Sequence, residues 1–433
     1  MTSDDTFADQ VSARILTELA VAPGSDGVAT VSRSLKMALD GSGPAIAPIP
    51  IGENELINNM RKTLRPDSPE FPLESSDISL VCLTSGSTEY PRGVLLSRQA
   101  LVASATAFGQ RFGTGHRWVV SMPIHRIAGM MTLVRSVVLD GDYVVDPATG
   151  GAQPFTAQTF IDTTTNAQRH NNASDRPLAV SLVPTQLARL VDAGTQGLHA
   201  LRQYDLVLSG AAATPQPLLT RLREEGVNVV VSYGMSETCG GCVFDGRPLD
   251  GVTITLGTQA DADPGRITIG GSVLASGYRL RPDLDAVTFI DGKLHTHDVG
   301  RLDSAGLLHV LGRLDDVVIV GGVNVSLSAV ESIIRHHQKI RDVAVIDYAD
   351  ELWGSLPIAC VVIDDDRNHQ HALTEEIKSV IAERMGRAAT PRLVVVMSNL
   401  PMLDTGKVDR LHLRLSIAQD IAEGRLPHPG VTH

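Results

Sequence analysis

Cysteine is scarce in this chain, with only four among 433 residues. So few thiols in so long a chain exclude a disulfide framework. Cys239 and Cys242 have the spacing of a redox pair or of half a zinc site, but two further ligands at matching spacing are lacking. His295 and His297 share one face of an expected strand, again without a third ligand nearby. We therefore favour structural roles over a zinc centre or a redox pair.

Long apolar runs and an excess of positive charge are also absent. No apolar stretch is long enough to span a membrane, and the opening Met-Thr-Ser-Asp-Asp is acidic where a signal peptide is basic. We therefore expect a cytoplasmic protein without a membrane span. The net charge of -12 argues against non-specific binding to nucleic acid, which needs a basic face. An anionic substrate must then be held by locally placed cations and backbone donors.

The length of the chain and its hydrophobic content of 43% predict a globular protein of two domains. Between residues 77 and 310, apolar strand patterns alternate with helical patterns, which predicts an α/β domain of doubly wound, largely parallel sheets. Three loops follow apolar strands, at Thr84, at 209–214 and at 232–238. Because ligands bind beyond the carboxyl ends of such strands, we expect these loops to line one crevice. The β-rich runs from Ile254 to Leu311 predict a barrel-like region that completes this domain.

The pattern changes after Gly312 to that of a small α+β domain. Ser328–Glu331 has the sequence of a capping box that opens a helix. Two strand patterns and a helical stripe follow. We therefore predict a large domain over residues 1–314 and a small C-terminal domain over residues 315–433. The first 75 residues, with Pro44, Pro48 and Pro50, carry no pattern that places them.

A loop of small hydroxyl residues, glycines and one cation follows an apolar run at Leu83–Gly93. Its hydroxyls, its backbone N–H groups and Arg92 suit an anion such as a triphosphate. The Gly-Lys-Ser/Thr triplet that ends a Walker loop is missing, and Pro91 interrupts the loop before a helix that we expect to start at Ser97. A kinase or GTPase is therefore disfavoured. Taken alone, the loop is better explained as a Gly/Ser surface turn between a strand and a helix.

Four further motifs follow the loop in order along the chain. They are Val231–Thr238, Thr296–Asp298, Gly312–Asp316 and Gly406–Arg410. Together with the loop, they resemble the adenylate-forming superfamily of acyl- and aryl-coenzyme A synthetases, luciferases and peptide-synthetase adenylation domains. Each motif is weak alone, and their shared order carries the resemblance. The resemblance implies a ligase that uses ATP, Mg²⁺ and coenzyme A, with a small C-terminal domain that moves as a lid.

The resemblance implies a nucleotide site on the large domain. It assigns ATP binding to Thr84, Ser85, Gly86, Ser87, Thr88, Arg92, Gly210, Ala211, Ala212, Tyr233, Ser236, Asp298 and Arg313. Within this set, Asp298 and Arg313 match the pair that contacts the ribose, and Tyr233 matches a wall of the adenine slot. The family usually has glycine in place of Glu89 and lysine in place of Arg92. Arginine keeps the charge and adds a planar fork, whereas Glu89 adds an anion near the triphosphate.

The same resemblance names the catalytic candidates. Lys407 matches the lysine that binds the acyl carboxylate and the α-phosphate during adenylation, although alone it would be interpreted as a solvated surface lysine. Glu237 matches the carboxylate that holds Mg²⁺, and otherwise suits the N-terminus of a helix. His125 would line the acid pocket. Asp315 matches the hinge about which the small domain rotates between two half-reactions.

The identity of the acid depends on a finer resemblance. Met122–Gly129, Tyr233–Gly246 and Pro248–Val252 look like the actinobacterial branch of the o-succinylbenzoate-CoA ligases, which serve menaquinone biosynthesis. Arg135 or Arg279 could then meet the second carboxylate of the acid. A surface or interdomain salt bridge is the alternative for either arginine.

Two other functions stay open. The first is another aryl- or fatty-acyl-CoA ligase, or an acyl-AMP ligase that loads a carrier protein, and the substrate profile separates these. The second is a nucleotide-binding homologue with impaired catalysis. Glu89 favours this alternative because it departs from the family pattern, whereas Lys407, Glu237 and Asp298 argue against it because they match that pattern. The expected partners are a small carboxylic acid, ATP and coenzyme A. The sequence leaves open whether the protein forms a homodimer.

Overall fold

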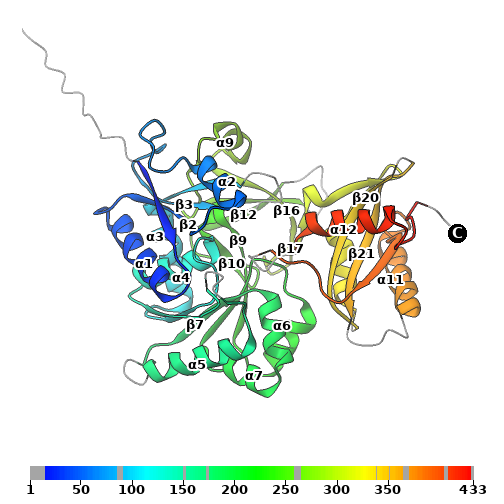
Figure 1. Cartoon of the computed structure of the whole chain (residues 1–433), viewed down its shortest axis with the longest axis horizontal. Helices are drawn as coiled ribbons and strands as arrows, with labels where there is room; N and C mark the ends of the chain where they lie inside the picture. Colours follow the sequence, from blue (N-terminus) through cyan, green and yellow to red (C-terminus); the bar gives the residue numbers. More distant parts are fainter. Residues whose placement is uncertain are drawn as a thin grey trace, which may run out of the picture.

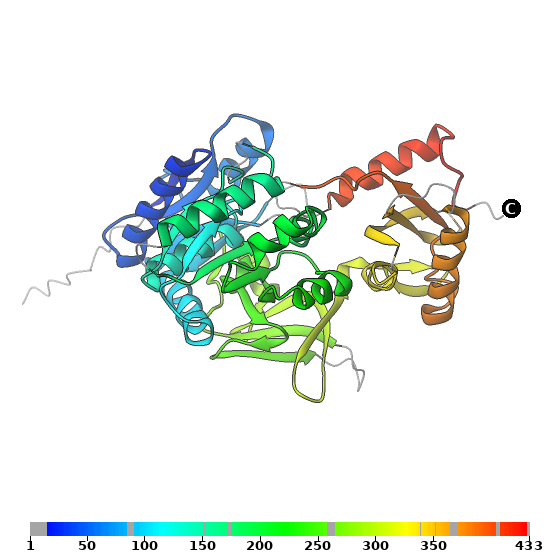
Figure 2. The ribbon, with the colours of Figure 1, turned by 90° about the horizontal axis from the view of Figure 1, so that it is seen from below.

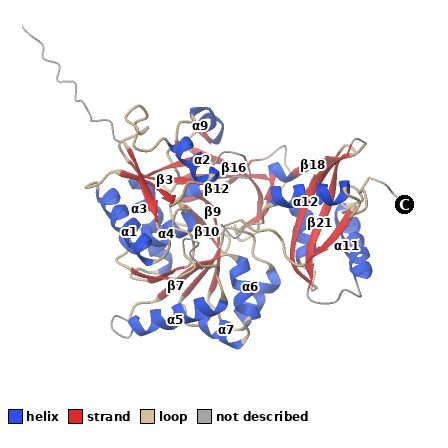
Figure 3. Ribbon diagram, viewed as in Figure 1, coloured by secondary structure: helices blue, strands red, loops and turns tan. Residues whose placement is uncertain are grey.

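The computed structural model describes residues 15–84, 91–149, 153–171, 175–257, 265–337, 339–350, 352–363, 370–403 and 408–430. These residues form a large body and a smaller C-terminal body, which lie side by side in Figure 1 and in Figure 2. Both bodies combine sheets with covering helices, as Figure 3 shows. The predicted α/β fold with a small C-terminal domain is confirmed. None of the described helices is long and apolar enough to cross a membrane.

The first sheet is built mainly from the N-terminal part of the large body. In spatial order its strands are β1 (Leu16–Val21), β2 (Ala45–Pro50), β3 (Ile78–Leu83), β4 (Gly93–Ser97) and β14 (Gly277–Tyr278). Strands β1, β2 and β3 run parallel, whereas β4 and β14 are antiparallel to their neighbours. Helices α1 (Ser25–Asp40) and α2 (Glu55–Leu64) connect the early strands. Residues 16–50, which lie in the part of the chain that sequence patterns do not place, therefore form the outer strands of this sheet.

The central sheet has seven strands. In spatial order they are β11 (Arg247–Pro248), β10 (Gly240–Phe244), β9 (Val229–Met235), β8 (Leu206–Ser209), β7 (Leu178–Leu182), β5 (Arg117–Val120) and β6 (Asp142–Val145). From β9 to β6 all neighbours are parallel, so their carboxyl ends meet at one edge. The helices along this part of the chain are α3 (Arg98–Phe112), α4 (Ile127–Val138), α5 (Ala157–Asn171), α6 (Pro184–Asp192), α7 (Thr195–Leu201) and α8 (Gln216–Glu224). The parallel strands consist largely of Val and Leu, which is typical of a sheet covered on both faces.

A third, antiparallel sheet completes the large body. Its strands are β12 (Val252–Gly257), β13 (Gly265–Gly271), β16 (Lys293–Leu302) and β15 (Phe289–Ile290), with β17 (Leu308–Arg313) on β16. Helix α9 (Pro282–Thr288) precedes β15. The register places Asp298 of β16 opposite Arg313 of β17. The β-rich region predicted from Ile254 to Leu311 is this sheet.

The small body is a sheet with helices on it. In spatial order its strands are β19 (Val323–Ser326), β18 (Val317–Val320), β21 (Gly354–Ile363) and β20 (Ile340–Asp350), with β22 (Leu393–Met397) parallel to β21. Its helices are α10 (Leu327–Arg335), α11 (Gln370–Met385) and α12 (Arg410–Ala422). Helix α12 buries Leu413, Ile417 and Ile421 in the apolar cluster that it shares with β20 and β21.

The two helix starts expected from the sequence have different outcomes. Helix α3 starts as expected, because Ser97 Oγ accepts a hydrogen bond from the backbone N–H of Ala100 at 3.1 Å. The capping box expected at Ser328–Glu331 is wrong. Ser326 caps α10 two residues earlier, and its Oγ accepts from the backbone N–H of Ala329 at 3.2 Å.

Arg279 joins the end of β14 to the segment that precedes β3. Its side chain is fully buried, and its guanidinium donates to the carbonyls of Leu64 at 3.0 Å, of Pro72 at 2.6 Å and of Phe71, and to Glu74 at 3.1 Å. Because these acceptors occupy its donors, the expectation that Arg279 could meet a substrate carboxylate is wrong. The residue instead fixes β14 against the rest of the large body.

We expect Arg279→Ala to destabilise the large body by about 3 kcal/mol, because the change leaves several carbonyls and a carboxylate without their buried donor. The urea midpoint of unfolding, followed by circular dichroism, measures this effect. Arg281→Ala is the matched control, since it removes only an exposed ion pair with Asp283 and should leave the midpoint nearly unchanged. Equal midpoints for the two variants would contradict the structural role of Arg279.

Candidate active site

A cavity of about 2930 Å³ lies at the carboxyl ends of the parallel strands and extends to the small body. The predicted nucleotide-binding and catalytic residues that line it are Thr84, Arg92, His125, Gly210, Ala211, Ala212, Tyr233, Ser236, Glu237, Asp298 and Arg313. They come from the loops after β3, β5, β8 and β9 and from strands β9, β16 and β17. The expectation that loops following separate strands line one crevice is confirmed.

Several of the predicted site residues lie outside the described residues. They are Ser85, Gly86, Ser87, Thr88, Glu89 and Lys407. Asp315 lies in the short 3-10 turn Leu314–Asp316, which follows β17 and precedes β18. The chain passes there from a sheet of the large body to the sheet of the small body.

The residues on either side of the phosphate-loop motif are joined by hydrogen bonds. The backbone N–H of Thr84 donates to the carbonyl of Arg92 at 2.9 Å, and the backbone N–H of Arg92 donates to Thr84 Oγ1 at 3.3 Å. The guanidinium carbon of Arg92 lies 5.8 Å from the ring centroid of Tyr278, which is within cation–π range. Among the described residues no carboxylate forms an ion pair with Arg92. Its charge is therefore available to an anion in the cavity.

Glu237 is half-buried in the 3-10 turn that follows β9. The hydroxyl of Tyr278 donates to Glu237 Oε1 at 2.7 Å, whereas Oε2 accepts no hydrogen bond from the described part of the chain. The described residues contain no cluster of three or more His, Cys, Asp or Glu that could hold a metal by itself. Glu237 thus fits Mg²⁺ held by one carboxylate together with nucleotide phosphates and water, which is the usual arrangement for this ion.

Sequence analysis missed Tyr278. It lies 41 residues from Glu237, and its two-residue strand carries no motif that would signal a contact. Burial and the negative charge of Glu237 raise the pKa of Tyr278, so that the hydroxyl keeps its proton and acts as a donor.

Asp298 is held by two neighbours. The hydroxyl of Tyr233 donates to Asp298 Oδ2 at 2.8 Å, and Arg313 Nη1 lies 3.2 Å from Oδ1. Burial, followed by the charge of Asp298, raises the pKa of Tyr233 and keeps its hydroxyl a donor. A carboxylate has about four acceptor positions, so the fixed Asp298 can also accept from the two hydroxyls of a sugar.

The loop Gly210–Ala212 follows β8, the strand next to β9, which carries Tyr233. Ala211 and Ala212 are exposed to the cavity, and Ala211 adopts a φ of 65°, in the left-handed region that few residues other than glycine adopt. The small side chains keep this part of the wall open. A planar group that lies against Tyr233 would find room there.

Basic residues line the cavity on the side of β5 and α4, among them His125 and Arg135. His125 follows β5 and is 8% exposed, and Arg135 of α4 is 4% exposed. The guanidinium carbon of Arg135 lies 4.0 Å from the ring centroid of Phe108 and 5.5 Å from that of Trp118. Burial lowers the pKa of Arg135 to about 9. Its Nε has no hydrogen-bond partner, and no described acidic side chain pairs with it, so an anionic ligand would stabilise this buried cation.

Cys239 and Cys242 are free thiols in the core, as are Cys82 and Cys360. Burial raises the pKa of Cys82, Cys242 and Cys360 to about 12. Because the thiolate is the form that reacts or binds metal, these positions have the character of inert structural thiols.

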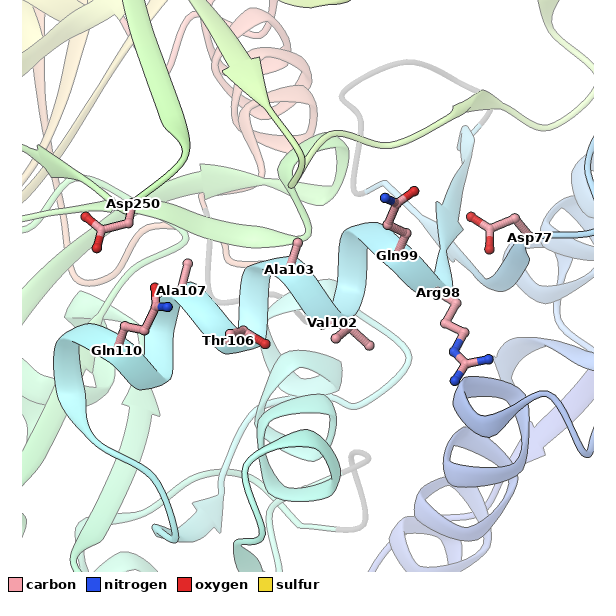
Figure 4. Close-up of a pocket in the computed structure, with 9 residues that line it drawn as sticks. All are labelled: Asp77, Arg98, Gln99, Val102, Ala103, Thr106, Ala107, Gln110 and Asp250. Carbon is pink, nitrogen blue, oxygen red and sulfur yellow. The ribbon is translucent and has the colours of Figure 1, made fainter.

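A separate hollow of about 640 Å³ runs along one face of α3, and Figure 4 shows the side chains that line it. Asp77 and Arg98 lie at one end, and Gln110 and Asp250 lie at the other. None of the predicted ATP-binding, catalytic, metal-binding or hinge residues lines this hollow, and Asp250 is its one residue from the segment Pro248–Val252. The large cavity is therefore the candidate site.

Known families match both bodies. The family described as AMP-binding enzyme matches residues 30–279, and the AMP-binding enzyme C-terminal domain matches residues 329–407. A Mycobacterium tuberculosis (strain H37Rv) protein named probable 2-succinylbenzoate--CoA ligase is 35% identical over 396 residues, which cover 90% of this chain and 96% of the relative. A 2-succinylbenzoate--CoA ligase of Bacillus subtilis (strain 168) is 28% identical over 349 residues, which cover 76% and 67% of the two chains.

Solved structures share the fold. The o-succinylbenzoate CoA synthetase of Bacillus subtilis, in complex with an acyl-adenylate intermediate, has a TM-score of 0.68 and 23% identity, over 93% of this chain and 88% of that one. An ATP-bound MatB from Rhodopseudomonas palustris has a TM-score of 0.75 and 20% identity, over 94% and 89% of the chains. At these identities the likeness establishes the fold.

We expect the cysteines to resist an aromatic disulfide reagent in the native protein, because burial keeps the thiols covered and protonated. At about pH 8, fewer than about one thiol per chain should react. All four should react after unfolding in guanidinium. Rapid reaction of two native thiols would contradict the structural role of Cys239 and Cys242 and would favour a redox pair.

Proposed function

The chain belongs to the family of AMP-binding enzymes, and we propose that it uses ATP to join o-succinylbenzoate to coenzyme A. The observation that carries the proposal is the relative of 35% identity, which matches 90% of this chain. The cavity supports it, because groups suited to a nucleotide line the same cavity as a buried arginine that has no acidic partner among the described residues. The reaction would belong to menaquinone biosynthesis and would take place in the cytoplasm, where ATP and coenzyme A are available.

In the first half-reaction, a carboxylate oxygen of the acid attacks the α-phosphorus of ATP. The bond from that phosphorus to pyrophosphate breaks, which yields an acyl adenylate. Negative charge builds up on the phosphates, so fixed cations and donors lower the barrier. Thr84 and Arg92 would face the phosphates, and Lys407 would contact the acyl carboxylate and the α-phosphate. Glu237 would hold Mg²⁺, which neutralises charge on the leaving pyrophosphate.

The nucleoside would be oriented by the cluster at the third sheet. Asp298, fixed by Tyr233 and Arg313, would accept from the ribose hydroxyls. The ring of Tyr233 and the loop Gly210–Ala212 would enclose the adenine. Orientation of this kind places the α-phosphorus in line with the attacking carboxylate, and it lowers the entropy that remains to be lost at the transition state.

In the second half-reaction, the sulfur of coenzyme A attacks the acyl carbonyl carbon, the thiol proton is released and the bond to AMP breaks. We propose that the small domain, residues 315–433, rotates about Asp315 between the half-reactions and so withdraws Lys407. Two observations support this hinge. The chain crosses between sheets in one short turn there, and the two family matches lie on either side of it, ending at residue 279 and beginning at residue 329.

Arg135 and His125 would form the acid pocket. An acid with two carboxylates can present one to ATP while the other meets a cation. Arg135 suits the second carboxylate, because its guanidinium is buried at the cavity wall without an acidic partner among the described residues. Occupation of the pocket would therefore also relieve the cost of burying that charge.

Mass spectrometry of a mixture with ATP, Mg²⁺, coenzyme A and o-succinylbenzoate tests the proposed function. We expect the thioester and AMP from o-succinylbenzoate, and little of either from benzoate or a fatty acid. Thioester formed from one of these control acids alone would show that the protein is a CoA ligase for a different acid. No AMP with any acid would favour a nucleotide-binding homologue without catalysis.

We expect Lys407→Ala to abolish pyrophosphate release that depends on the acid, because it removes the cation that the α-phosphate and the acyl carboxylate share. A variant of this kind should still form the thioester from synthetic acyl adenylate and coenzyme A. Coupled assays of the two half-reactions measure this separation. Intact pyrophosphate release by Lys407→Ala would show that another residue performs adenylation.

For Arg135→Met, we expect the KM for o-succinylbenzoate to rise about 10- to 100-fold, because a charge-assisted contact to the second carboxylate is lost. The KM for ATP should stay the same. The melting temperature should stay the same or rise, because the change removes a buried charge that has no acidic partner in the described part of the chain. A lower melting temperature with an unchanged KM would instead indicate a structural role for Arg135.

A further inference from the structure

Tyr278 connects two groups of opposite charge at the wall of the cavity. Its hydroxyl donates to Glu237 Oε1 at 2.7 Å, and its ring centroid lies 5.8 Å from the guanidinium carbon of Arg92. The residue is only 3% exposed. Both charged side chains line the cavity, as Tyr278 does. A neutral phenol therefore stands between the cation and the carboxylate.

Arg92 and Glu237 form no ion pair with each other in the described part of the chain. Direct contact between a guanidinium and a carboxylate is often bidentate and strong. Such a pair would cancel both charges where a triphosphate and its cation have to bind, and it would have to break before either could enter. Because the hydroxyl of Tyr278 engages Oε1 and its ring faces the guanidinium, the two charges stay separate and available.

The backbone of Tyr278 is fixed on several sides. Its N–H donates to Asp285 Oδ1 at 2.7 Å, and β14 pairs it with Val94 of β4. Gly277, which precedes it, has a φ of +144°, and a Cβ there would lie 2.6 Å from the Asp285 carboxylate. Arg279, which follows it, is anchored by its buried hydrogen bonds. The phenol is thus held at a set place beside β4, the strand that begins just after Arg92.

We propose that Tyr278 is a positioning residue for nucleotide activation, which orients Glu237 toward the metal and keeps it apart from Arg92. This inference rests on the proposed ATP-dependent function and deepens it, since it concerns the same cavity. Tyr278 acts through Glu237 and Arg92 and needs no contact with the reacting atoms. Loss of its hydroxyl should weaken metal binding but spare the second half-reaction, because the thiol attacks an acyl adenylate after the triphosphate has been consumed.

The variant Tyr278→Phe keeps the ring and removes the hydroxyl. We expect Mn²⁺, bound together with a non-hydrolysable ATP analogue and observed by electron paramagnetic resonance, to bind about tenfold more weakly. Thioester formation from synthetic acyl adenylate and coenzyme A should keep its wild-type rate. Tyr204→Phe is the matched control, because Tyr204 is equally buried and its hydroxyl lies 2.8 Å from Thr164 Oγ1. It should leave the Mn²⁺ affinity unchanged.

A double-mutant cycle assigns the effect to Glu237. Glu237→Gln alone should weaken Mn²⁺ binding, and the addition of Tyr278→Phe should cause no further loss, because the carboxylate through which the hydroxyl acts is already gone. An unchanged Mn²⁺ affinity in Tyr278→Phe would overturn the proposal. The same conclusion would follow if Tyr278→Phe weakened binding equally in the Glu237→Gln background.

Failure of this inference is distinguishable from failure of the proposed function. A wild-type protein that forms the thioester, combined with Tyr278→Phe of unchanged Mn²⁺ affinity, would refute the positioning role alone. A wild-type protein that binds neither the ATP analogue nor Mn²⁺ would refute both.

Discussion

The main physical constraint on this structure is electrostatic, because an acidic protein has to bind a polyanion. With a net charge of -12, the chain as a whole repels a triphosphate, so attraction has to come from cations and hydrogen-bond donors gathered in one place. The parallel strands supply that place, because their carboxyl ends open at a single edge. The first sheet brings Thr84 and Arg92 to this edge, and the third sheet brings Asp298 and Arg313. Three sheets therefore contribute to one cavity, and the fold gathers there cations and hydrogen-bond donors that can face an anion.

The charges on the cavity wall are kept from neutralising one another. Glu237 is engaged by a phenol hydroxyl rather than by Arg92, and Arg135 is buried against aromatic rings without an acidic partner among the described residues. Asp298 differs, because Arg313 and Tyr233 orient it from two sides and leave acceptor capacity for a sugar. Glu237 and Arg135 are thus held by neutral groups, whereas Asp298 is held by a neutral hydroxyl and by a cation. Buried, unmatched charge costs stability, and bound substrate can relieve that cost.

The elements with strong periodicity were predictable from the sequence. The crevice that the loops after separate strands line was predictable as well. Strand β3 ends at Leu83, directly before the loop expected at Thr84, and the start of α3 follows from the capping preference of Ser97. Contacts between distant segments were not predictable. Nothing local signals that Tyr278 reaches Glu237, or that Arg279 serves carbonyls more than 200 positions earlier in the chain. The cap of α10 was misplaced because Ser326 and Ser328 are equally good caps in sequence, and only the path of β19 selects the first.

The central claim is that the protein transfers AMP from ATP to a carboxylate in this cavity. Isotope exchange between pyrophosphate and ATP tests this claim most directly. The exchange is measured without coenzyme A, so it reports the first half-reaction alone. We expect exchange that requires both o-succinylbenzoate and Mg²⁺. If pyrophosphate did not exchange with ATP in the presence of o-succinylbenzoate or of any other acid, the cavity would bind nucleotide without activating a carboxylate, and the claim would be contradicted.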